Sequence, residues 1–62
     1  MSQSELPETK RRQIFQAVVE AQDQVSVAES RQRVARQFAV NEGQVRLIER
    51  EGLDNLWPPL EQ

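Results

Sequence analysis

The side chains of this sequence that are best suited to specific chemistry are arginines near its middle. Residues 30–50 hold five arginines against two glutamates, a local balance of +3, although the 62-residue chain has a net charge of −2. The five are Arg31, Arg33, Arg36, Arg46 and Arg50. Guanidinium groups bind phosphates and the edge of guanine, so this segment is a candidate surface for nucleic acid. The alternative is an ordinary mixed surface, on which Arg46 only pairs with Glu42 and Glu49.

The composition argues against several other kinds of chemistry. The chain has no cysteine and no histidine, so thiolate metal sites and histidine-based catalysis lose their usual residues. A chain this short rarely encloses a substrate pocket. We therefore expect no enzyme, no catalytic residue, no metal site and no cofactor.

Nothing in the sequence is typical of a membrane or secreted protein. No apolar run approaches the about 20 residues of a membrane span. The segment MSQSELPETKRR has no apolar stretch after its charges, so it does not read as a signal peptide. A cytoplasmic protein without a membrane partner is expected.

Apolar periodicity predicts a first helix over residues 7–22, after a frayed segment 1–6. Pro7 suits a first helical turn, where its missing N–H costs nothing. Ile14, Phe15, Val18 and Val19 share one helical face. Together with the two helices predicted below, this favours an all-α fold, a small three-helix bundle in a single domain over residues 1–62.

Two capping patterns predict the next two helices. Ser26 and Glu29 have the spacing of a capping box, which favours a second helix over residues 27–38; Ser30 is an alternative cap that would start it later. Asn41 with Gln44 forms a second such pattern before a third helix over residues 42–56. Its apolar stripe is Val45, Ile48, Gly52 and Leu56, with Leu53 beside it.

Gly52 and the segment after the third helix each leave two readings open. Gly52 either lets another helix approach closely or ends its own helix early. Pro58 stops the helix, which leaves residues 57–62 as an extended tail. Trp57 and Leu60 then either fold back over the core, which we favour, or present WPPL as a ligand for a partner.

The second and third helices fit the requirements of a helix-turn-helix. In such a unit, the first helix needs a small residue where the two helices cross and an apolar residue at its end. The turn then needs a small residue followed by an apolar one that packs into the core. The second helix needs two buried residues one turn apart. Ala35, Phe38, Ala39, Val40, Val45 and Ile48 meet these needs in that order. A plain helical hairpin with a similar core is the alternative. We expect Phe38 and Ile48 to be buried.

Residues 30–56 resemble the helix-turn-helix of region 4 in bacterial sigma factors of the main class. The matching residues are Val34, Phe38, Val40, Val45, Arg46, Ile48, Glu49 and Leu53. The family's base-reading positions are typically Arg, Glu, Arg and Gln, and their counterparts here are Glu42, Gly43, Arg46 and Leu47. Only Arg46 keeps the family's residue type. The resemblance implies a bacterial DNA-binding protein.

The sequence therefore favours a small transcriptional regulator that binds DNA through its third helix, as a homodimer or beside another protein. The base-facing residues would be Glu42, Gly43, Arg46, Leu47 and Arg50, and the phosphate contacts Arg31, Arg33, Arg36 and Asn41. The alternative is a protein-interaction module that binds RNA polymerase or another regulator without reading DNA.

Overall fold

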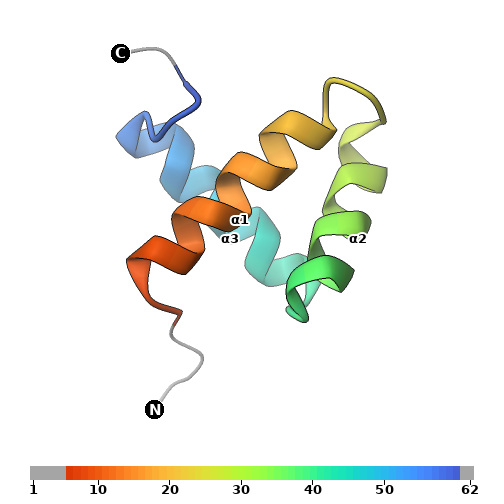
Figure 1. Ribbon diagram of the computed structural model, residues 1–62, viewed down its shortest axis with the longest axis horizontal. Coiled ribbons are helices and arrows are strands. Elements are labelled where there is room, and N and C mark those ends of the chain that lie inside the picture. The colour runs from red at the N-terminus through yellow and green to blue at the C-terminus, as the bar shows by residue number, and fades with distance from the viewer. Residues whose placement is uncertain (1–5, 61–62) are drawn as a thin grey trace.

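The computed structural model describes residues 6–60, and these residues form three helices that pack against one another (Figure 1). Helix α1 spans Glu8–Ala21, α2 spans Val27–Phe38 and α3 spans Glu42–Asn55. The described part of the chain has no strand. The predicted all-α fold, a small three-helix bundle, is confirmed.

Side-chain caps fix where α2 and α3 begin. The Asn41 side chain accepts a hydrogen bond from the Gln44 N–H at 2.8 Å, and the Asn41 N–H donates to the Gln44 side chain at 3.2 Å, so the predicted capping box is complete. Ser26 caps α2 by accepting from the Glu29 N–H. The return bond predicted for Glu29 is wrong, because its carboxylate accepts from Arg33 instead.

The alternative later start of α2 is also wrong. Ser30 lies inside the helix, is fully buried, and donates its hydroxyl to the Val27 carbonyl at 2.7 Å. A buried hydroxyl needs such a partner, and the preceding turn of its own helix supplies it. The predicted bounds of α2 are therefore those observed.

The other helices are slightly shorter than predicted. In α1, Pro7 and Gln22 are cap residues rather than helical ones. In α3, Leu56 is the C-cap and adopts the left-handed conformation at φ 53° and ψ 46°. Ala39 ends α2 in the same way, at φ 59° and ψ 42°. These two left-handed residues reverse the chain direction and bring the following segments back toward the core.

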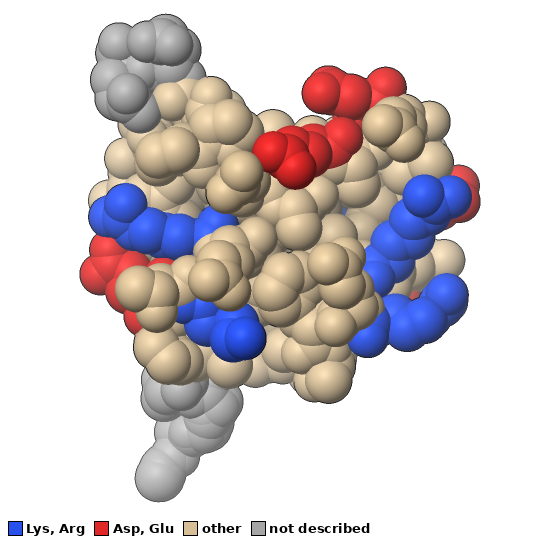
Figure 2. Space-filling view, in the orientation of Figure 1, with Lys and Arg blue, Asp and Glu red and all other residues tan. Residues whose placement is uncertain are grey.

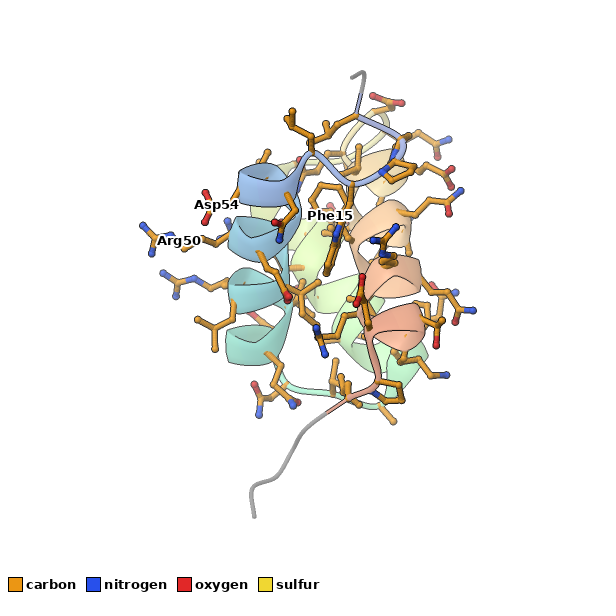
Figure 3. The ribbon with its side chains drawn as sticks, turned by 90° about the vertical axis from the view of Figure 1, so that its left-hand side faces the viewer. Phe15, Arg50 and Asp54 are labelled. Carbon is orange, nitrogen blue, oxygen red and sulfur yellow. The ribbon has the colours of Figure 1, made fainter. Side chains whose placement is uncertain are left out.

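The core lies where the three helices meet. Its buried apolar residues are Ile14, Phe15, Val18, Val34, Ala35, Val45, Ile48 and Trp57. Ile48 is buried as predicted, but Phe38 is only half-buried and lies under the Lys10 ammonium group, 5.8 Å from its ring centroid. Phe15 rather than Phe38 is the aromatic residue at the centre of the bundle (Figure 3).

Gly52 lets α1 and α3 come together at Phe15. A Cβ atom at Gly52 would lie 2.3 Å from the nearest ring atom of Phe15, closer than real Cβ atoms approach. The first of the two readings of Gly52 is confirmed, and the helix continues past it. The apolar stripe predicted for this helix is buried only as far as Gly52: Leu56, and Leu53 beside the stripe, are 51% and 58% exposed, because Phe15 packs over Gly52.

The segment after α3 folds back over the open end of the bundle. Trp57 is 4% exposed, and its ring packs edge-on against Phe15 with centroids 6.0 Å apart. Leu60 is half-buried against the same core. The predicted extended tail is therefore wrong for residues 57–60, whereas the favoured folding back of Trp57 and Leu60 is confirmed. Residues 61–62 lie outside the described part.

At the other end of the chain, Leu6 packs against the core. Its carbonyl accepts a hydrogen bond from Arg11 at 2.6 Å. The predicted fraying is therefore wrong for Leu6, and residues 1–5 lie outside the described part. None of the helices in residues 6–60 has the length and apolar character that crossing a bilayer requires.

Candidate nucleic-acid interface on helix α3

The outer face of α3 is turned away from the other two helices and forms one side of a shallow groove. Positions three, four and seven residues apart lie on the same face of a helix. The groove has a volume of about 480 Å³ and is lined by Gly43, Arg46, Leu47, Arg50, Leu53 and Asp54 of α3, with Glu49 and Arg31 at its side. Four of the five predicted base-facing residues thus lie together.

Two ion pairs hold α3 so that this face stays outside. On one flank, Glu49 accepts two hydrogen bonds from Arg31 of α2, from Nε at 3.0 Å and from Nη2 at 2.8 Å. On the other flank, Glu51 accepts from Arg11 of α1 at 3.0 Å and 3.1 Å, a two-point contact. Such two-point guanidinium–carboxylate contacts fix orientation as well as distance.

Glu49 also joins α3 to the end of α1. Its second carboxylate oxygen accepts from the side chain of Gln22, the C-cap of α1, at 2.9 Å, so this one carboxylate of α3 bonds residues of α2 and of the end of α1. The Glu49 side chain is only 12% exposed. Glu49 was expected to pair only with Arg46 of its own helix, whereas its observed partners Arg31 and Gln22 join α3 to α2 and to the end of α1.

Two of the predicted phosphate contacts are occupied by carboxylates. The hydrogen bond that Arg31 donates to Glu49 raises the pKa of Arg31 above its ordinary value, although burial opposes this. The positive charge of Arg31 is therefore already matched by the Glu49 carboxylate. Arg33 pairs with Glu29 at 3.1 Å, but both side chains are about half exposed. A surface pair of that kind is weak, about 0–1 kcal/mol, so Arg33 is available to a stronger partner.

Arg36, Arg46 and Arg50 differ from these two. All three are exposed, and none makes an ion pair with any residue in the described range. The alternative in which Arg46 pairs with Glu42 and Glu49 is therefore wrong. Arg46 and Arg50 lie one helical turn apart on α3, and Arg50 points away from the bundle together with Asp54 (Figure 3).

The start of α3 shows what the remaining predicted residues do. Glu42 is exposed in the first turn, where its charge favours the helix dipole. Gly43 is exposed at the end of the groove. The side-chain oxygen of Asn41 accepts a hydrogen bond in the capping box, so the side chain has only its NH₂ group left for a phosphate contact.

Leu53 and Asp54 belong to the groove but were missed as site residues. They follow Arg50 by three and four positions, and that spacing is the signal that would have found them. Leu47 is 68% exposed, so the groove has one apolar residue at each edge, Leu47 and Leu53, with charged residues between them.

The side of the molecule that α1 covers looks different. In Figure 2, which views the molecule from that side, basic and acidic side chains lie toward the edges around an uncharged centre. Its basic side chains lie in separate groups at opposite sides of the view rather than in one central cluster. Residues 6–60 contain no cluster of three or more acidic side chains able to hold a metal ion.

No family model matches the chain, and no curated protein and no solved structure is significantly similar to it. The site must therefore be interpreted from its own geometry.

Proposed function

We propose that this domain binds DNA through the outer face of α3 and acts as a small transcriptional regulator with a sigma region 4-like helix-turn-helix. The observation that carries the proposal is the state of Arg46 and Arg50. Both are exposed, lie one turn apart on the outward face of α3, and lack an ion-pair partner within the described residues. An α-helix of this kind fits the major groove.

Three arginines have a role in this proposal. Arg46 reads a guanine, a contact worth about 1–3 kcal/mol of discrimination. Leu47 beside it touches a thymine methyl group, and Glu42 accepts from a cytosine amine. Arg33 and Arg36 of α2 contact phosphates, because Arg33 is only loosely paired with Glu29 and Arg36 makes no ion pair with any residue from 6 to 60. Arg31 is not assigned to a phosphate, since Glu49 holds it.

The first experiment is an NMR titration of labelled protein with random-sequence duplex DNA at low salt. We expect shifts at α3 residues 42–50 and near Arg33 and Arg36. Two phosphate contacts imply a slope near −1.8 when the logarithm of the association constant is plotted against the logarithm of the salt concentration. The affinity should therefore fall about tenfold between about 50 mM and about 200 mM salt. A salt-independent interaction, or none, would contradict the proposal.

Variants then separate base reading from general attraction. On a duplex selected from a random library, Arg46→Ala should cost about 1–3 kcal/mol and relax the preference at one position. Arg33→Ala should weaken binding to all duplexes equally and reduce the magnitude of the salt slope by about one unit. Arg12→Ala removes one charge from an exposed position on α1 and is the matched control, with no change in binding expected. Equal losses on selected and random duplexes for Arg46→Ala would reject base reading.

A protein-interaction module that does not read DNA is the second candidate. The observation that favours it is the exposed Leu47 in a groove that also contains Asp54, in a chain of net charge −2. RNA polymerase or another regulator would be the partner. An apolar contact of this kind survives added salt, so the two-salt titration distinguishes the candidates.

A further inference from the structure

Four exposed charged residues follow one another at intervals of four along the outer face of α3, in the order Glu42, Arg46, Arg50 and Asp54. We call these four residues the charged row. Side chains four positions apart are neighbours on a helix, so the spacing would allow an ion pair at each end of the row. None of the four makes an ion pair with any residue from 6 to 60. The row has no net charge, and an acid lies on each side of its basic centre.

The fold gives the carboxylate of Asp54 no structural role. Within residues 6–60 its side chain makes neither an ion pair nor a hydrogen bond, and it points away from the bundle beside Arg50 (Figure 3). Asp54 lies in the last turn of α3, where the partial negative charge of the helix end repels a carboxylate. That turn holds no basic residue to offset the repulsion. An acid that weakens its own helix and faces outward points to a role in binding.

The separation of the two acids restricts how α3 can enter DNA. Glu42 and Asp54 are twelve positions apart, which is about 18 Å along a helix, whereas the major groove is about 12 Å wide. If α3 crossed the groove, each carboxylate would lie over the phosphates of one strand, and such like-charge contacts are unfavourable. If α3 lies along the groove, both carboxylates meet base edges instead. The acids therefore favour a helix that follows the groove.

The base edges of the groove then divide between the acids and the arginines. Guanine presents two acceptors, N7 and O6, which suit Arg46 and Arg50, whereas a carboxylate is repelled by acceptors. Cytosine presents the amino group from which a carboxylate accepts a hydrogen bond. Four positions of a helix span about 6 Å, which is about two base-pair steps. The charged row therefore matches cytosine, guanine, guanine and cytosine in that order, at intervals of about two base pairs.

We propose that Glu42 and Asp54 are specificity-determining residues of the DNA-binding face, each of which accepts from a cytosine amino group and repels phosphates and acceptor base edges. This inference rests on the proposed DNA binding. It adds the class of duplex that is recognised, a site rich in G·C pairs, and a role for Asp54. The two acids lower the affinity for DNA in general and raise the preference for the recognised site over other sequences.

The test first selects a duplex from a random library with the unmodified full chain. The selected site should hold two guanines between two cytosines within about seven base pairs. Glu42→Gln and Asp54→Asn each remove one negative charge and keep the size of the side chain. Each should tighten binding to a random duplex about two- to fivefold at low salt, the effect of one exposed charge. Each should also lower the discrimination at one cytosine of the selected site about tenfold.

Two matched variants control for net charge. Glu8→Gln matches Glu42→Gln, because Glu8 is also exposed and is also the first residue of its helix, α1. Asp23→Asn matches Asp54→Asn, because Asp23 is exposed and lies between α1 and α2. Neither control should change binding to either duplex by more than about twofold. Circular dichroism should show that all four variants keep the fold, since all four side chains are exposed.

Three results would overturn the inference while the proposed DNA binding stands. The first is that Glu42→Gln and Asp54→Asn leave binding to the random duplex unchanged or weaken it. The second is that both variants keep the discrimination of the unmodified chain at every position of the selected site. The third is that Glu8→Gln and Asp23→Asn tighten binding as much, which would assign the effect to net charge. If the unmodified chain binds no duplex at all, the proposed function fails together with the inference.

Discussion

Replacing Gly52 with alanine should destabilise this protein, although the same change inside most helices stabilises. Alanine favours a helix over glycine by about 1 kcal/mol. Here the added Cβ would lie 2.3, 2.4 and 2.6 Å from three ring atoms of Phe15. Phe15 is 1% exposed and packs on Trp57, so its ring has little room to move. Overpacking of a core costs about 1–3 kcal/mol, and three such contacts justify the upper value.

The expected net loss is therefore about 2 kcal/mol, since the propensity gain offsets part of the clash. A domain of this length has roughly 3–9 kcal/mol of stability in total. The midpoint of thermal unfolding should fall by about 8–16 °C, at about 4–8 °C per kcal/mol for small domains. Far-UV circular dichroism during heating, and during urea unfolding, measures both quantities.

Gly43→Ala is the matched control on the same helix. A Cβ there meets only the Asn41 side-chain oxygen, at 3.2 Å, and no core atom. It should change stability by less than about 1 kcal/mol. Combining Gly52→Ala with Phe15→Leu should cost less than the sum of the two single changes, because the smaller side chain relieves the clash. A rise in melting temperature for Gly52→Ala, or strict additivity in the double variant, would refute the packing described for Phe15.

Four further variants test other parts of the structure. Phe15→Ala should lower the unfolding free energy by about 3–5 kcal/mol and nearly abolish folding, whereas Phe38→Ala should lower it by only about 1–2 kcal/mol. Equal losses for the two variants, measured by circular dichroism, would show that Phe15 is not the central aromatic residue of the core. Ala39→Gly should add about 1 kcal/mol in urea unfolding, because Ala39 is left-handed at φ 59°; a loss would contradict that strain. Glu49→Gln should lower the unfolding free energy, because it removes the charge that pairs with Arg31. It should also make the dependence of DNA affinity on salt concentration steeper by about one unit, since Arg31 is then free to contact a phosphate. An unchanged salt dependence would show that Arg31 does not reach a phosphate.

The helices could be predicted from the sequence because their signals are local. Ser26 and Asn41 cap within three residues of themselves, and the predicted starts of α2 and α3 are those observed. The end of α3 was predicted one residue late because a left-handed C-cap is usually glycine, and Leu56 gives no such signal.

The core was harder to predict because burial depends on which helices meet. Periodicity placed Phe15 and Phe38 on apolar faces alike, but only Phe15 lies opposite Gly52. The extra space at Gly52 decides which ring is central, and no pattern within α1 or α2 carries that information. Leu53 and Leu56 continue the apolar pattern of α3 in the sequence, but no helix packs over them in the fold, so both side chains are exposed.

The sequence was enough to place the candidate site on α3. It could not show which of the arginines are without an ion-pair partner. The partners of Arg31 and Arg11 lie 18 and 40 positions away along the chain, so only the folded structure shows which arginines are matched. The pair between Arg33 and Glu29, four positions apart, could have been predicted from spacing alone.

The carboxylate of Glu49 has a consequence for how the protein folds and unfolds. Its hydrogen-bond partners are Gln22 at the end of α1 and Arg31 of α2, so it is satisfied only when all three helices are assembled. A segment containing α2 and α3 alone would leave Val45 and Ile48 without the α1 side chains of the shared core and Glu49 without one of its donors. We therefore expect that α2 and α3 do not fold as a unit on their own, and that unfolding is a single cooperative transition rather than the loss of one helix at a time.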